Sequence, residues 1–127
     1  MTELRQGIFG IDLGTTYSVV SYIDDSGKPV IVKNMLQDQD STPSVVYFEN
    51  DTNVVVGSVA KESAVLAPDQ VVSMVKREMG NRDFRRTIFG KDYDAPTISA
   101  LILGALAKDA SAVTGRQVEK VVITVPA

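Results

Sequence analysis

The stretch Ile-Asp-Leu-Gly-Thr-Thr-Tyr-Ser at residues 11–18 constrains the fold of this chain more than any other, because it places a turn between two apolar segments. It follows the apolar residues 8–10 and leads into a second apolar run from Tyr17 to Ile23. This pattern predicts an antiparallel β-hairpin in which Gly14 permits a tight turn at positive φ. The tip of the hairpin then carries one carboxylate, two hydroxyls and several backbone N–H groups.

The chemical groups at this tip suit phosphate and magnesium. Backbone N–H groups in a concave turn can donate to phosphate oxygens, and the hydroxyls of Thr15 and Thr16 add donors without adding charge. The carboxylate of Asp12 would repel phosphate on its own, so it fits better as a partner of Mg²⁺, directly or through water. An ordinary hairpin is the alternative, because Asp and Gly are common in turns for conformational reasons alone. Both interpretations stay open on these residues.

Composition excludes several classes of function. The chain has 127 residues and a net charge of −3, which fits one domain and argues against a general nucleic-acid or anionic-membrane binder. It has no cysteine and no histidine, which removes thiolate and imidazole chemistry and the usual zinc ligands. We find no apolar run that approaches membrane-spanning length and no signal-peptide core in residues 1–10, so a cytoplasmic protein is expected.

The remaining patterns predict a mixed α/β fold. Three antiparallel strands are expected at 8–13, 16–23 and 29–34, and two short strands at 44–48 and 53–56. A short helix is expected at 57–66, with Ala60, Ala64 and Val65 on one side. The spacing of Val71, Val72, Val75 and Met79 predicts a second short helix that ends at Gly80. Residues 81–94 are polar and predict no regular element.

The last third of the chain predicts one long helix and one strand. The helix begins at Pro96, keeps an apolar stripe and ends before Gly115. The run 118–125 is apolar at nearly every residue, which is typical of a strand covered on both faces. Because the covering elements would have to come from elsewhere, we expect an incomplete domain of a larger protein. Exposed apolar surface on this sheet predicts self-association of the chain.

Four motifs in order resemble one protein family. They are Ile-Asp-Leu-Gly-Thr-Thr-Tyr-Ser at 11–18, Ser-Thr-Pro-Ser-Val-Val-Tyr-Phe at 41–48, Val-Lys-Arg-Glu-Met-Gly at 75–80 and Val-Val-Ile-Thr-Val-Pro-Ala at 121–127. Together they are similar to the N-terminal part of the nucleotide-binding domain of the DnaK-type heat-shock protein 70 chaperones. The first motif alone is shared with actin-like proteins and sugar kinases, whereas the four in sequence are specific.

The resemblance implies a fold and a division of the chain. The family's ATPase domain has the actin-like, ribonuclease-H-like fold, with two lobes around a deep cleft, and this chain would supply much of the first lobe. That lobe is a mixed sheet with antiparallel hairpins, a long helix and a following parallel strand. Residues 1–39 and 95–127 would form its base subdomain, and 40–94 an inserted upper subdomain.

The resemblance also implies roles for particular residues. Gly14, Thr15, Thr16 and the backbone of Tyr17 would hold the phosphates of ATP or ADP, and Asp12 would sit by Mg²⁺, through water. Lys76 would orient the attacking water and stabilise the γ-phosphate, although its position beside an apolar helical face suggests an ordinary surface lysine. Pro126 would relay the nucleotide state to a substrate-binding domain; without the resemblance it merely ends a strand.

The implied parent is an ATP-dependent, stress-responsive chaperone that works on unfolded clients with co-chaperones. The rest of the nucleotide site lies beyond residue 127 in that family, so this chain alone is expected to be inactive. A sugar kinase fragment and a non-catalytic actin-like module are the alternatives. The chain departs from the family between Lys76 and Ile98, where it is shorter than usual, and at 34–40, which lacks a glycine usually found there. Both departures put contacts with nucleotide-exchange partners in doubt.

Overall fold

A computed structural model describes residues 8–33, 39–118 and 120–124, and its main sheet contains the strands expected at the two ends of the chain. Strands β1 (Ile8–Leu13), β2 (Tyr17–Ile23) and β3 (Pro29–Val32) form an antiparallel series. Strand β10 (Lys120–Thr124) pairs with β1 in parallel, and β4 (Thr42–Pro43) adds to β2. The mixed sheet with a final parallel strand is therefore confirmed, whereas β4 was not predicted.

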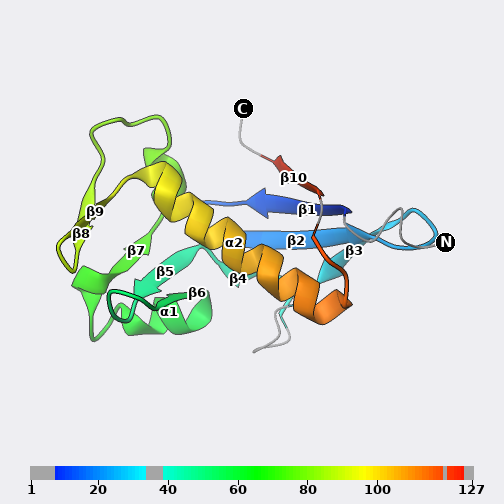
Figure 1. Cartoon of the computed structure of the whole chain (residues 1–127), viewed down its shortest axis with the longest axis horizontal. Coiled ribbons are helices and arrows are strands. Elements are labelled where there is room, and N and C mark those ends of the chain that lie inside the picture. Colours follow the sequence, from blue (N-terminus) through cyan, green and yellow to red (C-terminus); the bar gives the residue numbers. More distant parts are fainter. Residues whose placement is uncertain (1–7, 34–38, 119, 125–127) are drawn as a thin grey trace.

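A second group of short elements lies beside this sheet (Figure 1). Strands β5 (Val45–Phe48), β6 (Val54–Val56) and β7 (Val71–Ser73) form one antiparallel sheet in the order β6-β5-β7, and β8 (Arg86–Ile88) pairs with β9 (Lys91–Tyr93). Helix α1 (Ser58–Ser63) packs on β5, and two single-turn 3₁₀ helices are present, η2 (Pro68–Gln70) and η3 (Val75–Glu78).

The helix predicted through Val71 and Val72 is wrong, because these residues form strand β7. Both side chains are buried, but on opposite faces of the strand: Val71 packs with Val45 and Ala60, while Val72 belongs to the main core. A strand buried on both faces loses the alternation that distinguishes it from a helix. Only the end of the predicted helix is helical, as the single turn η3, and Met79 is 47% exposed instead of buried.

Two smaller predictions in this region also differ from the structure. Helix α1 forms where expected, but Val65 lies beyond its end and is 83% exposed. The segment expected to be irregular contains the hairpin of β8 and β9, which turns at Phe89 and Gly90 with φ of 52° and 77°. Two positive φ values in a two-residue loop are typical of a type I′ turn, for which Asn-Gly is the usual signal.

Helix α2 (Ala95–Thr114) confirms the long helix and joins the two groups of strands. Asp94 caps its first turn by accepting a hydrogen bond from the Thr97 N–H at 2.9 Å, an interaction that lowers the pKa of the Asp94 carboxyl. Gly115 ends the helix in the left-handed region at φ 70°. Figure 1 shows α2 lying across the main sheet, and the helix also contacts η3, β5 and β6.

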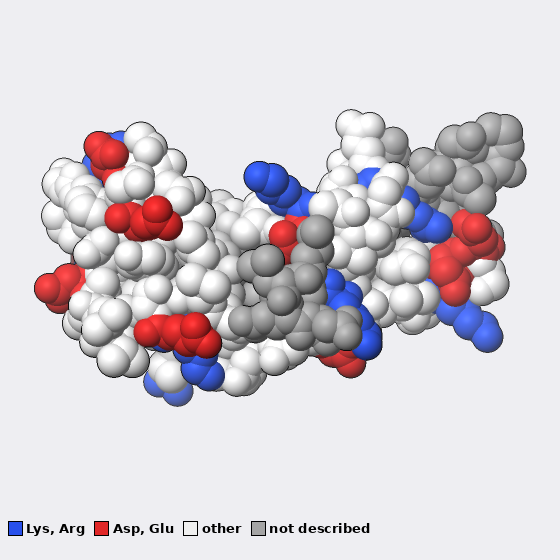
Figure 2. All heavy atoms as spheres, turned by 90° about the horizontal axis from the view of Figure 1, so that it is seen from below, with Lys and Arg blue, Asp and Glu red and all other residues white. Residues whose placement is uncertain are grey.

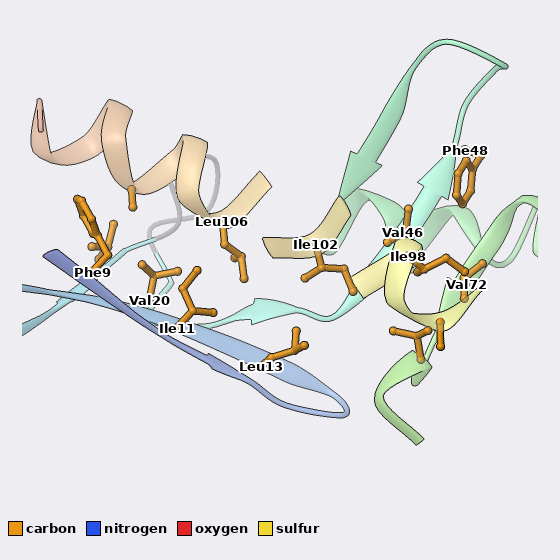
Figure 3. Packing of buried hydrophobic residues seen from close by; sticks show 14 of the residues in the cluster. Phe9, Ile11, Leu13, Val20, Val46, Phe48, Val72, Ile98, Ile102 and Leu106 are labelled. Atoms are coloured by element: carbon orange, nitrogen blue, oxygen red, sulfur yellow. The ribbon is translucent and has the colours of Figure 1, made fainter. Parts of the chain in front are cut away.

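One continuous hydrophobic core lies under α2 (Figure 3). Ile98, Ile102 and Leu106 on the helix are almost fully buried, and they pack with side chains from both groups of strands. The members contributed by the strands include Phe9, Ile11, Leu13, Val20, Val46, Phe48 and Val72. Because β1 and the segment 71–78 share this core, α2 fixes where the end of β1 lies relative to η3.

Two surface features bear on the expected partners. Helix α2 has 20 residues, and an 18-residue window within it has a mean hydropathy of 1.3, which is enough in length and composition to cross a membrane, so the expectation that no run approaches that length is wrong. One of its faces is nevertheless packed on the core described above. On the face shown in Figure 2, basic side chains stay in separate groups among acidic ones and form no continuous basic area.

Candidate functional site

The hairpin tip between β1 and β2 consists of Gly14, Thr15 and Thr16, and it is held tightly by its own backbone. A Cβ atom added at Gly14 would lie 2.1 Å from the carbonyl oxygen of Tyr17. Gly14 is not among the residues with positive φ, so the predicted reason for this glycine is wrong. Glycine is required because the chain folds back so closely that a side chain would collide with the backbone.

The second half of the tip is braced by the segment that follows in β4 and β5. Tyr17 and Ser18 pair with Pro43 and Thr42, and the Ser44 N–H donates to the carbonyl of Thr16 at 2.9 Å. The hydroxyls of Ser18 and Ser44 lie 2.7 Å apart and are buried. The Thr-Pro-Ser motif therefore supports the tip, a contact that sequence reasoning did not anticipate. We call residues 14–17 the loop of β1 and β2 below.

Lys76 reaches the start of this loop from a segment 63 residues away. Its ammonium nitrogen donates a hydrogen bond to the carbonyl oxygen of Leu13, the residue just before Gly14. Met74 turns the chain in the left-handed region at φ 57°, and Val75 is buried beside it at 3% exposure. The left-handed turn and the buried valine direct a half-buried Lys76 at the loop. Lys76 is therefore not the free surface lysine that its position in the sequence suggests.

Asp12 lies on the opposite face of the sheet from the core. Its neighbours Ile11 and Leu13 are buried under α2, so the alternation of the strand turns Asp12 outward, and its side chain is exposed. In the sheet it pairs with Val19 on one side and Thr124 on the other. Among the described residues no three His, Cys, Asp or Glu side chains are grouped so that they could hold a metal. Asp12 can therefore contribute one ligand, and the others would be water, phosphate or residues from elsewhere.

A second lysine near the loop was not singled out from the sequence. The Lys61 ammonium on α1 donates to the Tyr17 hydroxyl at 3.3 Å and lies 5.3 Å from the centre of the Tyr17 ring. Thr15, Thr16 and Lys61 also line a hollow of about 170 Å³, whose other walls are mostly apolar. Nothing in the local sequence of α1 signals this contact, because it depends on how α1 packs on β5.

The predicted site residues thus fall into three groups. Gly14, Thr15, Thr16 and Tyr17 form one loop, and Lys76 is brought to its start. Asp12 lies two residues before Gly14 on the exposed face of β1. Pro126 lies outside the described residues. The arrangement joins hydroxyls, backbone N–H groups, a carboxylate and an ammonium within one edge of the fold, which is the chemistry of a phosphate and Mg²⁺ site.

Comparison with known proteins shows the family to which the chain is related. The family model described as Hsp70 protein matches residues 8–89 and 82–127. The two matched segments overlap at residues 82–89, within the part of the chain that is expected to be shorter than in its relatives. The chaperone protein DnaK of Thermotoga neapolitana is 39% identical over 127 residues, which is all of this chain and 21% of that protein. DnaK of Thermotoga petrophila gives the same identity and coverage.

The chain therefore spans about a fifth of the length of these curated relatives. The family match covers nearly all of the chain and includes every described strand and helix. It also includes the loop of β1 and β2, Lys76 and the final parallel strand, which are the features that the fold brings together. The chain belongs to the Hsp70 family.

Proposed function

We propose that this chain forms one wall of the Mg-ATP site of an ATP-driven chaperone. The observation that carries the proposal is the hydrogen bond from Lys76 to the Leu13 carbonyl, which holds a cation at the start of the loop of β1 and β2. Phosphoryl transfer depends on positioning and on cations that face developing negative charge. A half-buried lysine beside a glycine-containing loop supplies both requirements.

Each group at this edge has a distinct task in the proposed site. The N–H groups and hydroxyls of the loop bind phosphate oxygens, and Asp12 holds Mg²⁺ through water. The magnesium, when bound with the nucleotide, neutralises phosphate charge. Lys76 orients the attacking water and stabilises the γ-phosphate, and for this its ammonium exchanges the Leu13 carbonyl for phosphate oxygen. Pro126 is the proposed relay to a substrate-binding domain.

The wider proposal concerns the protein that carries this chain. In it, residues 1–39 and 95–127 form the base subdomain of the first lobe, and residues 40–94 the upper subdomain. The other lobe completes the ATP cleft, and a substrate-binding domain holds unfolded clients with the help of co-chaperones, in the cytoplasm. Membership of the Hsp70 family supports a chaperone over a sugar kinase.

Removing Lys76 from the full-length protein tests the proposal. Lys76→Ala should reduce single-turnover ATP hydrolysis about 100- to 1000-fold, because it removes one electrostatic contact to the transition state. ATP affinity should stay within about threefold of the parent, since the loop and Mg²⁺ still bind the phosphates. Lys91→Ala is the matched control, because Lys91 is an exposed lysine on β9. Hydrolysis by Lys76→Ala at the parent's rate would overturn the assignment of Lys76.

A further inference from the structure

Lys61 makes a tertiary contact at the end of the loop of β1 and β2. Its ammonium is 3.3 Å from the Tyr17 hydroxyl and 5.3 Å from the ring centre, so the phenol oxygen is the closer partner. The two residues are 44 positions apart, and both are exposed. The contact therefore depends on the fold and is not a neighbour effect within α1.

The backbone beneath Lys61 is firmly placed. Ala60, the preceding residue, is fully buried and packs with Val45 of β5 and Val71 of β7. The Lys61 N–H donates to the carbonyl of Gly57 at 3.0 Å in the first turn of α1. Because Ala60 is packed against two strands, the neighbouring Lys61 leaves α1 from a fixed point beside the loop.

Lys61 also lines two hollows. The first, of about 170 Å³, contains Thr15 and Thr16 in its wall, and of the described residues that line it Lys61 alone is cationic. The second, of about 580 Å³, is lined by Lys61 together with Tyr17, Gln39, Pro43, Ser58 and Glu62. Lys61 is thus common to both linings, and among the described residues Glu62 is the acidic one that lines either hollow.

The two lysines bracket the loop from its two ends. Lys76 binds the carbonyl just before Gly14, and Lys61 binds the side chain of Tyr17 at the start of β2. A loop that must hold phosphate oxygens in one geometry loses less entropy on binding when both of its ends are already fixed. A cation beside the two threonines also favours a polyanion in the same space.

We propose that Lys61 is a positioning residue of the phosphate site, which fixes Tyr17 and with it the C-terminal end of the loop. This inference rests on the proposed Mg-ATP function. Its role differs from that of Lys76, because it acts on the bound nucleotide through the loop and not on the transition state. Its loss therefore weakens nucleotide binding and leaves the rate constant of hydrolysis nearly unchanged.

The test uses the full-length protein and compares Lys61→Met, Lys61→Arg and Tyr17→Phe, with Lys91→Met as the control. Lys61→Met should weaken ATP affinity about two- to fivefold, the worth of an exposed contact between a cation and an aromatic side chain. Single-turnover hydrolysis at saturating ATP should change less than twofold. Lys61→Arg should restore affinity, because arginine keeps the charge and the donor.

The Tyr17→Phe background separates the positioning role from charge alone. Phenylalanine removes the hydroxyl acceptor, so Lys61→Met should cost less affinity in that background than in the parent. Equal costs in both backgrounds, or parental ATP affinity in Lys61→Met, would overturn the inference while the nucleotide site still stands. A parent that binds no ATP would instead refute the proposed function, and this inference with it.

Discussion

The close approach of Gly14 to Tyr17 predicts that Gly14→Ala strains the hairpin severely. The added Cβ would lie 2.1 Å from the Tyr17 carbonyl oxygen, whereas Cβ atoms essentially never come within 3.0 Å of another heavy atom. The backbone must therefore move by at least 0.9 Å, the difference between these two distances. Tyr17 cannot move freely, since it pairs with Pro43 and the adjoining Thr16 carbonyl binds Ser44. A backbone shift of this kind typically costs about 1–3 kcal/mol.

Thermal denaturation measures this cost. For a domain of this length, 1 kcal/mol corresponds to about 4 °C, so Gly14→Ala should lower Tm by about 4–12 °C. Gly104→Ala is the matched control, because Gly104 is an exposed glycine inside α2 and a Cβ there meets no atom within 4 Å. It should raise stability by about 0.5–1 kcal/mol. A parental Tm for Gly14→Ala, or an equal loss in Gly104→Ala, would refute the steric reasoning.

Three further predictions concern the metal, a helix cap and the chain by itself. Asp12→Asn in the full-length protein should weaken Mg-ATP binding as well as turnover. Titration at several Mg²⁺ concentrations should show that excess Mg²⁺ partly restores both. Unchanged affinity would contradict the role of Asp12. The pKa of Asp94 is lowered by its bond to Thr97, so its contribution to stability is present above the ordinary value of 3.8 and is lost as the pH falls through the lower folded value. Asp94→Ala should therefore destabilise the protein more at pH 7 than at pH 2 in urea titrations, and an equal loss at both would argue against the cap. The isolated chain should bind Mg-ATP weakly or not at all, and micromolar affinity in calorimetry would count against this expectation. It should also self-associate through the exposed Val122 and Ile123 of β10. A monomer in sedimentation that binds no hydrophobic dye would count against self-association.

The parts of the fold that follow from local patterns were predictable. The strands of the first hairpins are marked in the sequence by apolar runs and turn residues. Helix α2 is marked by a periodic apolar stripe, with Pro96 near its start and Gly115 just past its end. The motif at 11–18 likewise identified the loop. These features depend on residues close together in the chain, and a single sequence reports them well.

The parts that failed depend on tertiary packing. Val71 and Val72 are both apolar because each is buried in a different core, and two adjacent apolar residues are equally typical of a helical face. The two cores exist only because α1 and α2 pack on opposite faces of this strand. The β8–β9 hairpin turns on Phe89-Gly90, in which a phenylalanine stands where Asn would signal the turn. Lys61 carries no local signal at all. Lys76 was named through a family motif, and its position at Leu13 follows from η3 packing on α2.

The packing of α2 joins the two ends of the segment between Met79 and Asp94. The thioether sulfur of Met79, just after η3, accepts from the Ser99 hydroxyl of α2 at 3.3 Å, so the exit of η3 and the first turns of the helix are joined directly. The chain between them leaves from and returns to this junction. The body of the β8–β9 hairpin is also tied to the rest of the fold, since Ile88 is buried in the main core and Arg86 donates to the carbonyl of Val71. Its turn stands clear of the core, because Phe89 is 49% exposed and a Cβ added at Gly90 would meet no atom within 4 Å. Residues inserted at that turn should leave Lys76 in place, so a protein engineer could graft a reporter or binding peptide there.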